Sequence, residues 1–117
     1  MESFKEFITE ESTEIRDAKR VFTKLQSMYP DVPKFPLVFK NLGDRGGGYL
    51  ETSKTRGTKQ WFIDRMVINT KLWSNDPDYT VVHEFAHAIL THTKNKPGHS
   101  KEHDKLTFEL AKKFNLV

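Results

Sequence analysis

Five consecutive residues in the second half of the chain have the spacing of a metal-dependent hydrolytic site. The run His83-Glu84-Phe85-Ala86-His87 is an H-E-x-x-H motif. Residues four apart on an α-helix differ by only about 40° in direction, so His83 and His87 would lie one above the other. Two neutral imidazoles so placed can hold one divalent metal ion. A carboxylate at position 84 would lie beside that ion and accept a proton from a water molecule, so the spacing predicts metal-assisted hydrolysis with Glu84 as general base.

A catalytic zinc site usually takes a third protein ligand, and three more histidines are candidates. His99 follows a Pro-Gly turn that reverses the chain and could return its ring to the motif. His92 is five residues after His87 and would point away from His83 on the same helix. We therefore predict His83, His87 and His99 as metal ligands, with His103 as a second-layer or transition-state partner.

Acidic side chains near the C-terminus are the alternative third ligands. Glu102, Asp104 and Glu109 all lie in this region, and Asp104 is the best placed of them. Glu102 and Asp104 are also explained as acids in the first turn of a helix, where the helix dipole stabilises negative charge. The longer signature H-E-x-x-H-x-x-G-x-x-H is absent, since Leu90 and Thr93 occupy its last two fixed positions. The chain is therefore not a metzincin.

Length and composition restrict the class of protein. A chain of 117 residues forms one domain, here residues 1–117. Cysteine is absent, which excludes disulfides, zinc ribbons and thiol nucleophiles, so His, Asp or Glu must hold any metal. Zinc is the expected metal, although imidazoles also accept other transition ions. With no membrane-length apolar stretch and no signal peptide, we expect no membrane association and a cytoplasmic location.

The elements expected around the motif form a small α+β domain. They are a helical region over residues 4–29 in one or two pieces, strands over 35–40, 49–52 and 61–69, the motif helix over 76–92, and a last helix capped by Ser100. Apolar residues cover most of the motif helix and leave one polar stripe. Burying such a stripe costs free energy unless it faces a cleft or a metal, which agrees with the predicted site.

The hairpin between the two later strands is basic. Lys54, Arg56 and Lys59 lie near its tip without any acid, and Trp61 follows. Cations beside an aromatic ring are what a nucleic-acid backbone and an unstacked base would contact, so these three basic residues are candidate nucleic-acid contacts. The alternative is a tip that is basic only for solubility, which fits the formal net charge of +3 as well. The glycine-rich loop 41–48 lacks the P-loop ending and is expected to be a flexible turn or bulge.

Two of these segments resemble the SprT-like domain of zinc metallopeptidases. They are V-V-H-E-F-A-H-A at residues 81–88 and P-G-H-S-K-E-H at 97–103, preceded by a strand ending M-V-I-N. In that family the third ligand lies in a pattern close to His-Gly-x-x-Phe/Trp. His99 matches the ligand, while Ser100 replaces the glycine and His103 replaces the aromatic residue.

The resemblance covers most of the chain from about Asp17 onward and has implications for fold and function. It implies a minimal zincin-like domain with an N-terminal helix, a small three-stranded, mainly antiparallel sheet, the motif helix and a C-terminal helix. It also implies a zinc metalloendopeptidase acting on protein or peptide substrates. In several members of the family those substrates are bound to DNA, so weak DNA binding is a further expectation.

Other functions remain open at this point. An oxyanion-stabilising group is expected for hydrolysis, with His103, Tyr49 and Arg65 as candidates. In a second hypothesis the zinc is structural, His103 or Asp104 closes its fourth position, and the basic hairpin binds DNA or a partner protein. In a third, the substrate is a non-peptide amide.

Overall fold

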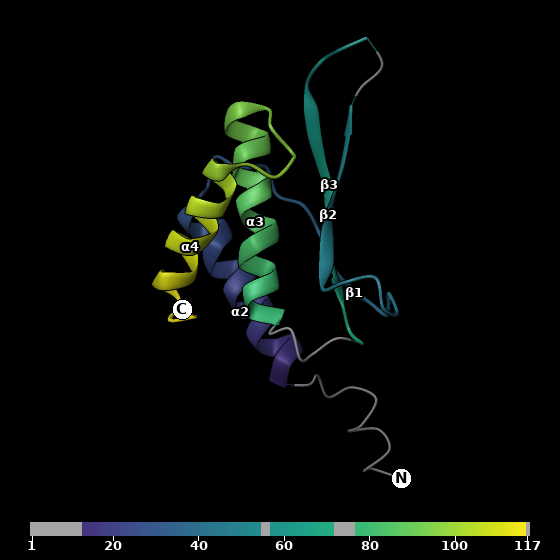
Figure 1. Cartoon of the computed structure of the whole chain (residues 1–117), viewed down its shortest axis with the longest axis vertical. Helices are drawn as coiled ribbons and strands as arrows, with labels where there is room; N and C mark the ends of the chain where they lie inside the picture. The colour runs from purple at the N-terminus through teal and green to yellow at the C-terminus, as the bar shows by residue number, and fades with distance from the viewer. Residues whose placement is uncertain (1–12, 55–56, 72–76, 117) are drawn as a thin grey trace.

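The computed structural model describes residues 13–54, 57–71 and 77–116. These parts of the chain contain three helices and a three-stranded sheet, which confirms the α+β class (Figure 1). In chain order the elements are α2 (Thr13–Met28), β1 (Leu37–Lys40), β2 (Gly48–Lys54), β3 (Trp61–Asn69), α3 (Pro77–Lys94) and α4 (Lys101–Lys113). None of the described helices has the length and apolar character needed to cross a membrane.

Helix α2 covers the core with one apolar face. Its buried residues are Ala18, Val21, Phe22 and Leu25, at the spacing of one helical face. The helix ends at Met28, shortly before two prolines that cannot continue it. The part of the expected first helix before residue 13 lies outside the described residues.

The sheet has the strand order β1-β3-β2, with β3 in the centre. Strands β2 and β3 pair antiparallel as a hairpin, whereas β1 pairs parallel with β3. The sheet is therefore mixed rather than mainly antiparallel. The reason is topological: β3 inserts between β1 and β2, and after the hairpin reversal it runs in the direction of β1.

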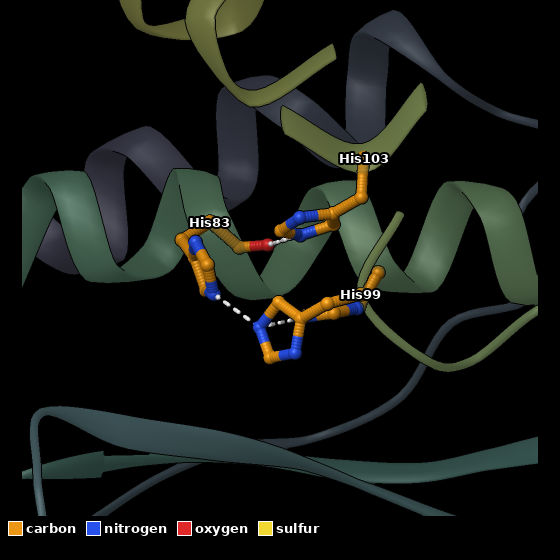
Figure 2. Close-up of side chains that lie close together, drawn as sticks. His83, His99 and His103 are labelled. Carbon is orange, nitrogen blue, oxygen red and sulfur yellow. Dashed lines mark hydrogen bonds between the residues drawn. The ribbon is translucent and has the colours of Figure 1, made fainter. Parts of the chain in front are cut away.

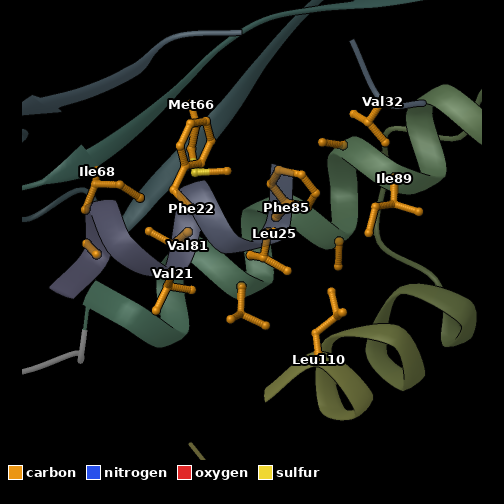
Figure 3. Packing of buried hydrophobic residues seen from close by; sticks show 14 of the residues in the cluster. Val21, Phe22, Leu25, Val32, Met66, Ile68, Val81, Phe85, Ile89 and Leu110 are labelled. Atoms are coloured by element: carbon orange, nitrogen blue, oxygen red, sulfur yellow. The ribbon is translucent and has the colours of Figure 1, made fainter. Parts of the chain in front are cut away.

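Helix α3 lies between the other elements and packs against α2, α4, β2 and β3. Met66 and Ile68 of β3 belong to the same core cluster as Val81 and Phe85 of α3 (Figure 3). Because side chains alternate along a strand, Val67 points to the opposite face of the sheet. The described helices therefore lie on one face of the sheet, and α3 is buried around most of its circumference, as its apolar residues predicted.

The glycine-rich loop between β1 and β2 is held in a defined shape rather than being a free turn. The side chain of Asn69, only 1% exposed, lies inside the loop. Its oxygen accepts from the backbone N–H groups of Leu42 and Lys71, and its nitrogen donates to the carbonyls of Gly43 and Gly46. All four hydrogen-bonding positions of this buried amide are thus satisfied, which stabilises the loop beside the start of α3.

Candidate metal centre

Helix α3 supplies the first two histidines of the centre. Pro77 occupies the first position of the helix, where its missing N–H costs nothing. Packing of Val82 and Phe85 in the core fixes the rotation of the helix about its axis. His83 and His87 then lie one turn apart on a shared face, His83 partly exposed and His87 only 6% exposed.

The ring of His99 joins them from the loop between α3 and α4 (Figure 2). Its Nε2 lies 3.3 Å from the Nε2 of His83 and 3.3 Å from the Nε2 of His87. Ligand nitrogens at about 2.0–2.1 Å from a tetrahedral zinc are separated by about 3.3–3.4 Å, so these spacings match those around one ion. Hydrogen bonding alone explains them poorly, because one ring nitrogen carries at most one proton to share between two neighbours.

Helix α4 begins directly after His99, and its N-terminus is capped. The hydroxyl of Ser100 accepts a hydrogen bond from the backbone N–H of His103 at 3.1 Å, as the sequence predicted. Glu102 in the first turn pairs with Lys94 at the end of α3 and, at 3.5 Å, with Lys96. These contacts fix the start of α4 against the end of α3.

His103 is completely buried beneath the other three rings. Its Nε2 lies 3.0 Å from the backbone carbonyl of His83 and therefore carries the proton, because a carbonyl only accepts (Figure 2). The ring stacks on that of His87, with centroids 3.7 Å apart and planes 22° from parallel. One ligand atom from each of the four histidines lies within 4.8 Å of the others. His103 thus supports the backbone and ring of two predicted ligands, and is close enough to be a fourth.

The surroundings of the histidines favour the neutral, metal-binding form. Burial lowers the pKa of His83, and repulsion by His103 and His99 adds to the effect. For His87, burial and then the same kind of repulsion lower the pKa to about 3. A hydrogen bond between His87 and the backbone of Pro97 partly opposes this shift. The buried Nδ1 of His103 has no hydrogen-bond partner among the described residues. A cluster of neutral imidazoles costs free energy without a ligand, so this donor set fits a borderline-soft divalent ion such as zinc.

Glu84 lies on α3 next to the first histidine, with its carboxyl group against strand β2. The side chain is 7% exposed, and this burial raises its pKa to about 7. The backbone N–H of Leu50 donates to the carboxylate and opposes the shift. A carboxyl group titrating near neutrality is suited to taking up and releasing a proton in that range.

None of the acidic alternatives belongs to the group of ligand atoms that lie within 4.8 Å of one another. Glu102 is engaged by two lysines, which hold the pKa of its carboxyl group below the ordinary value. Asp104 is largely exposed, with Oδ1 3.8 Å from the Nδ1 of His103, and Glu109 is exposed on α4. His92 is exposed on α3 and outside the cluster, as predicted from its position.

Two of the three candidate oxyanion groups lie on the face of the sheet opposite the helices, and therefore away from the histidine cluster. Arg65 and Tyr49 alternate with core-facing residues, so they point away from the helices. Arg65 pairs with Glu51 at 2.9 Å, and this contact raises the pKa of its guanidinium group. The alternation of β3 was visible in the sequence, but the side of the sheet that α3 covers was not.

The basic hairpin is only partly described. The ammonium group of Lys54 lies 4.7 Å from the ring centroid of Trp61, and Lys59 is exposed. Arg56 lies outside the described residues. Sequence reasoning missed two residues near the site, Leu50 and Asn95, because each acts through contacts between elements far apart in the chain.

A scan against protein-family models and searches of curated proteins and of solved structures found no match to this chain. The class that fold and site define is thus an α+β domain with a four-histidine cluster able to bind a metal ion. A more specific function for this domain must therefore be argued from the residues of the site.

Proposed function

We propose that this protein is a zinc-dependent metallopeptidase of the SprT-like, zincin-like type. The observation that carries the proposal is the convergence of three imidazole nitrogens beside a buried glutamate. His83, His87 and His99 would hold the ion. When bound, zinc polarises a scissile carbonyl and makes a water molecule more acidic.

Glu84 is the general base in this proposal. Its carboxylate takes a proton from the attacking water and delivers it to the leaving nitrogen. The Leu50 N–H orients the carboxylate by donating to it. Burial between α3 and β2 keeps bulk water from the carboxylate and holds its pKa near 7, where both proton transfers are feasible.

The free edge of β2 is the proposed binding site for an extended substrate. Strand β2 pairs only with β3 among the described residues, and the Leu50 N–H is directed to Glu84 rather than into the sheet. In an antiparallel ladder alternate residues present their N–H and C=O groups to the same edge. The backbone groups of Thr52 and Lys54 therefore face the same free edge of β2 as those of Leu50. A peptide pairing there would gain main-chain hydrogen bonds with little sequence preference.

Proteolysis with a matched pair of variants tests this function. Wild type should digest casein, and a chelator should abolish the digestion. Glu84→Gln should keep stoichiometric zinc and lose activity by about 10²–10⁴-fold, the usual contribution of a general base. Glu109→Gln, which changes an exposed glutamate on α4, should retain full activity. Full activity of Glu84→Gln would refute the mechanism.

A non-catalytic zinc-stabilised binding module is the second candidate. It is favoured by one observation, the fourth imidazole of His103 within 4.8 Å of the other ligand atoms. X-ray absorption of the zinc-loaded protein distinguishes the two functions. Four nitrogen ligands would support the closed, structural site, whereas three nitrogens and one oxygen support the peptidase.

Weak binding of DNA by the hairpin is a separate part of the proposal. The exposed side chains of Lys54 and Lys59 supply positive charge where β2 ends and shortly before β3 begins. Affinity for an oligonucleotide should fall as salt increases and should fall further in a Lys54→Glu/Lys59→Glu variant. Unchanged, salt-independent affinity in that variant would exclude the hairpin as the contact.

A further inference from the structure

Asn95 joins the end of α3 to the β2–β3 hairpin, defined here as β2, β3 and the residues between them. Its backbone is left-handed, with φ of 55°, and its N–H bonds back to the carbonyl of Thr91. Its side chain bridges to the hairpin. The oxygen accepts from the N–H of Trp61 at 2.7 Å, and the nitrogen donates to the carbonyl of Lys59 at 2.7 Å.

The loop that Asn95 begins is the one that carries His99. Helix α3 ends at Lys94 and α4 begins at Lys101, so a short connection separates two well-packed elements. The side chain of His99 is exposed, and its ring contacts the neighbouring rings of His83 and His87. Its position therefore depends on how the two ends of the loop are anchored. Ser100 anchors one end and Asn95 the other.

We propose that Asn95 is a positioning residue that couples the β2–β3 hairpin to the metal centre. By fastening Lys59 and Trp61 to the start of the His99 loop, it holds the third ligand over the two on α3. Since coupling between two sites is reciprocal, metal binding should order the hairpin at Lys59 and Trp61, and contacts made by the hairpin should alter metal affinity. The proposal rests on the metal site alone and does not require hydrolysis.

The chain contains a natural control for the left-handed backbone. Asn115 follows the last turn of α4 with φ of 58°, and the N–H groups of Asn115 and Leu116 bond back to Lys112 and Ala111. This is the Schellman type of helix end, where asparagine serves for its backbone conformation. Unlike Asn95, its side chain makes no hydrogen bond to another described residue.

The experiment compares Asn95→Gly with Asn115→Gly, since glycine keeps the left-handed conformation and removes only the side chain. Zinc affinity is measured by competition with a chromophoric chelator. Hydrogen exchange of the Trp61 amide is measured with and without zinc, and the visible spectrum of the cobalt-loaded protein reports ligand geometry. Circular dichroism verifies that each variant is folded.

We expect Asn95→Gly to bind zinc about 10–100-fold more weakly, the usual effect of losing an outer support of a metal ligand. Its Trp61 amide should exchange faster, and zinc should no longer slow that exchange as it does in wild type. Asn115→Gly should match wild type in both measurements. Wild-type zinc affinity in Asn95→Gly would overturn the proposal, whether or not the hairpin is loosened.

Asn95→Asp covers the case in which the glycine variant does not fold. Aspartate tolerates the left-handed backbone and keeps the acceptor for the Trp61 N–H, but it cannot donate to Lys59. We expect a smaller loss of zinc affinity than in Asn95→Gly, and wild-type affinity would refute the proposed role. A peptidase test that fails while these results hold would reject the proposed function and leave the coupling intact.

Discussion

Helix α3 and the segment that follows it hold their histidines in different ways. His83 and His87 belong to one buried helix, and their separation follows from the helical repeat. His99 lies on an exposed loop, where hydrogen bonds and ion pairs at the loop ends set its position. Local helical geometry thus places two of the three proposed ligands, and tertiary contacts place the third.

This difference indicates how the centre forms. The α3 pair should exist in the folded protein with or without metal, because the core immobilises the helix. The His99 ring is exposed at the end of an anchored loop, so a bound ion should restrict its motion further. Changes on α3 should therefore affect stability as well as metal binding, whereas changes at His99 should affect metal binding alone.

The largest expected effect is that of removing the loop ligand. Structural zinc sites contribute about 10–16 kcal/mol from four ligands, so His99→Ala should weaken zinc binding on the order of 10²–10³-fold. The melting temperature of the metal-free protein should not change, because the side chain is exposed. His92→Ala, an exposed histidine on α3, is the control and should bind zinc as wild type does. Calorimetric titration and thermal unfolding measure the two quantities.

The next effect concerns the buried base on α3. Folding raises the pKa of Glu84 from about 4.5 to about 7, so the folded state binds more protons than the unfolded state between these values. Stability from this group is lost as pH rises through that window. Metal-free Glu84→Gln should therefore be more stable than wild type by about 3 kcal/mol at pH 8, with the difference vanishing below about pH 4.

Chemical denaturation of both proteins at several pH values measures this gain. Glu109→Gln, at an exposed position, should show no such pH dependence. If Glu84→Gln were less stable than wild type at pH 8, the ionised carboxylate of Glu84 would not destabilise the folded state.

His103 tests whether α4 supports the α3 pair directly. His103→Phe keeps a ring to stack on His87 but removes the N–H that donates to the carbonyl of His83. Zinc affinity should fall by roughly tenfold, as for other outer-layer substitutions, and His103→Ala should lose more because it also leaves a cavity. An affinity loss equal to that of His99→Ala would instead make His103 a ligand.

The smallest effect is expected at the cap of α4. Ser100→Ala removes the side-chain acceptor for the His103 N–H and should destabilise the protein by about 1 kcal/mol. Ser27→Ala, at an exposed position in α2, should not destabilise it. Denaturant unfolding of the metal-free proteins provides the comparison, and equal stability of the two variants would show that the cap contributes nothing.

Several features of the fold were predictable because they depend on neighbours in the chain. The burial of Val81, Val82 and Phe85 followed from their spacing, and Ser100 was recognisable as a helix cap. The bounds of β3 were predicted as observed. The parallel pairing of β1 was missed, since strand order depends on how the hairpin inserts into the sheet.

The sequence by itself determined that two imidazoles and a glutamate share one turn of a buried helix, because the helical repeat is a property of the backbone. Only the tertiary structure decided that His99 completes the cluster, that His103 lies beneath it, and that Tyr49 and Arg65 face away. Those outcomes depend on how a loop, a helix and a sheet pack together. That packing arises from contacts such as Asn95 with the hairpin, between residues more than thirty positions apart.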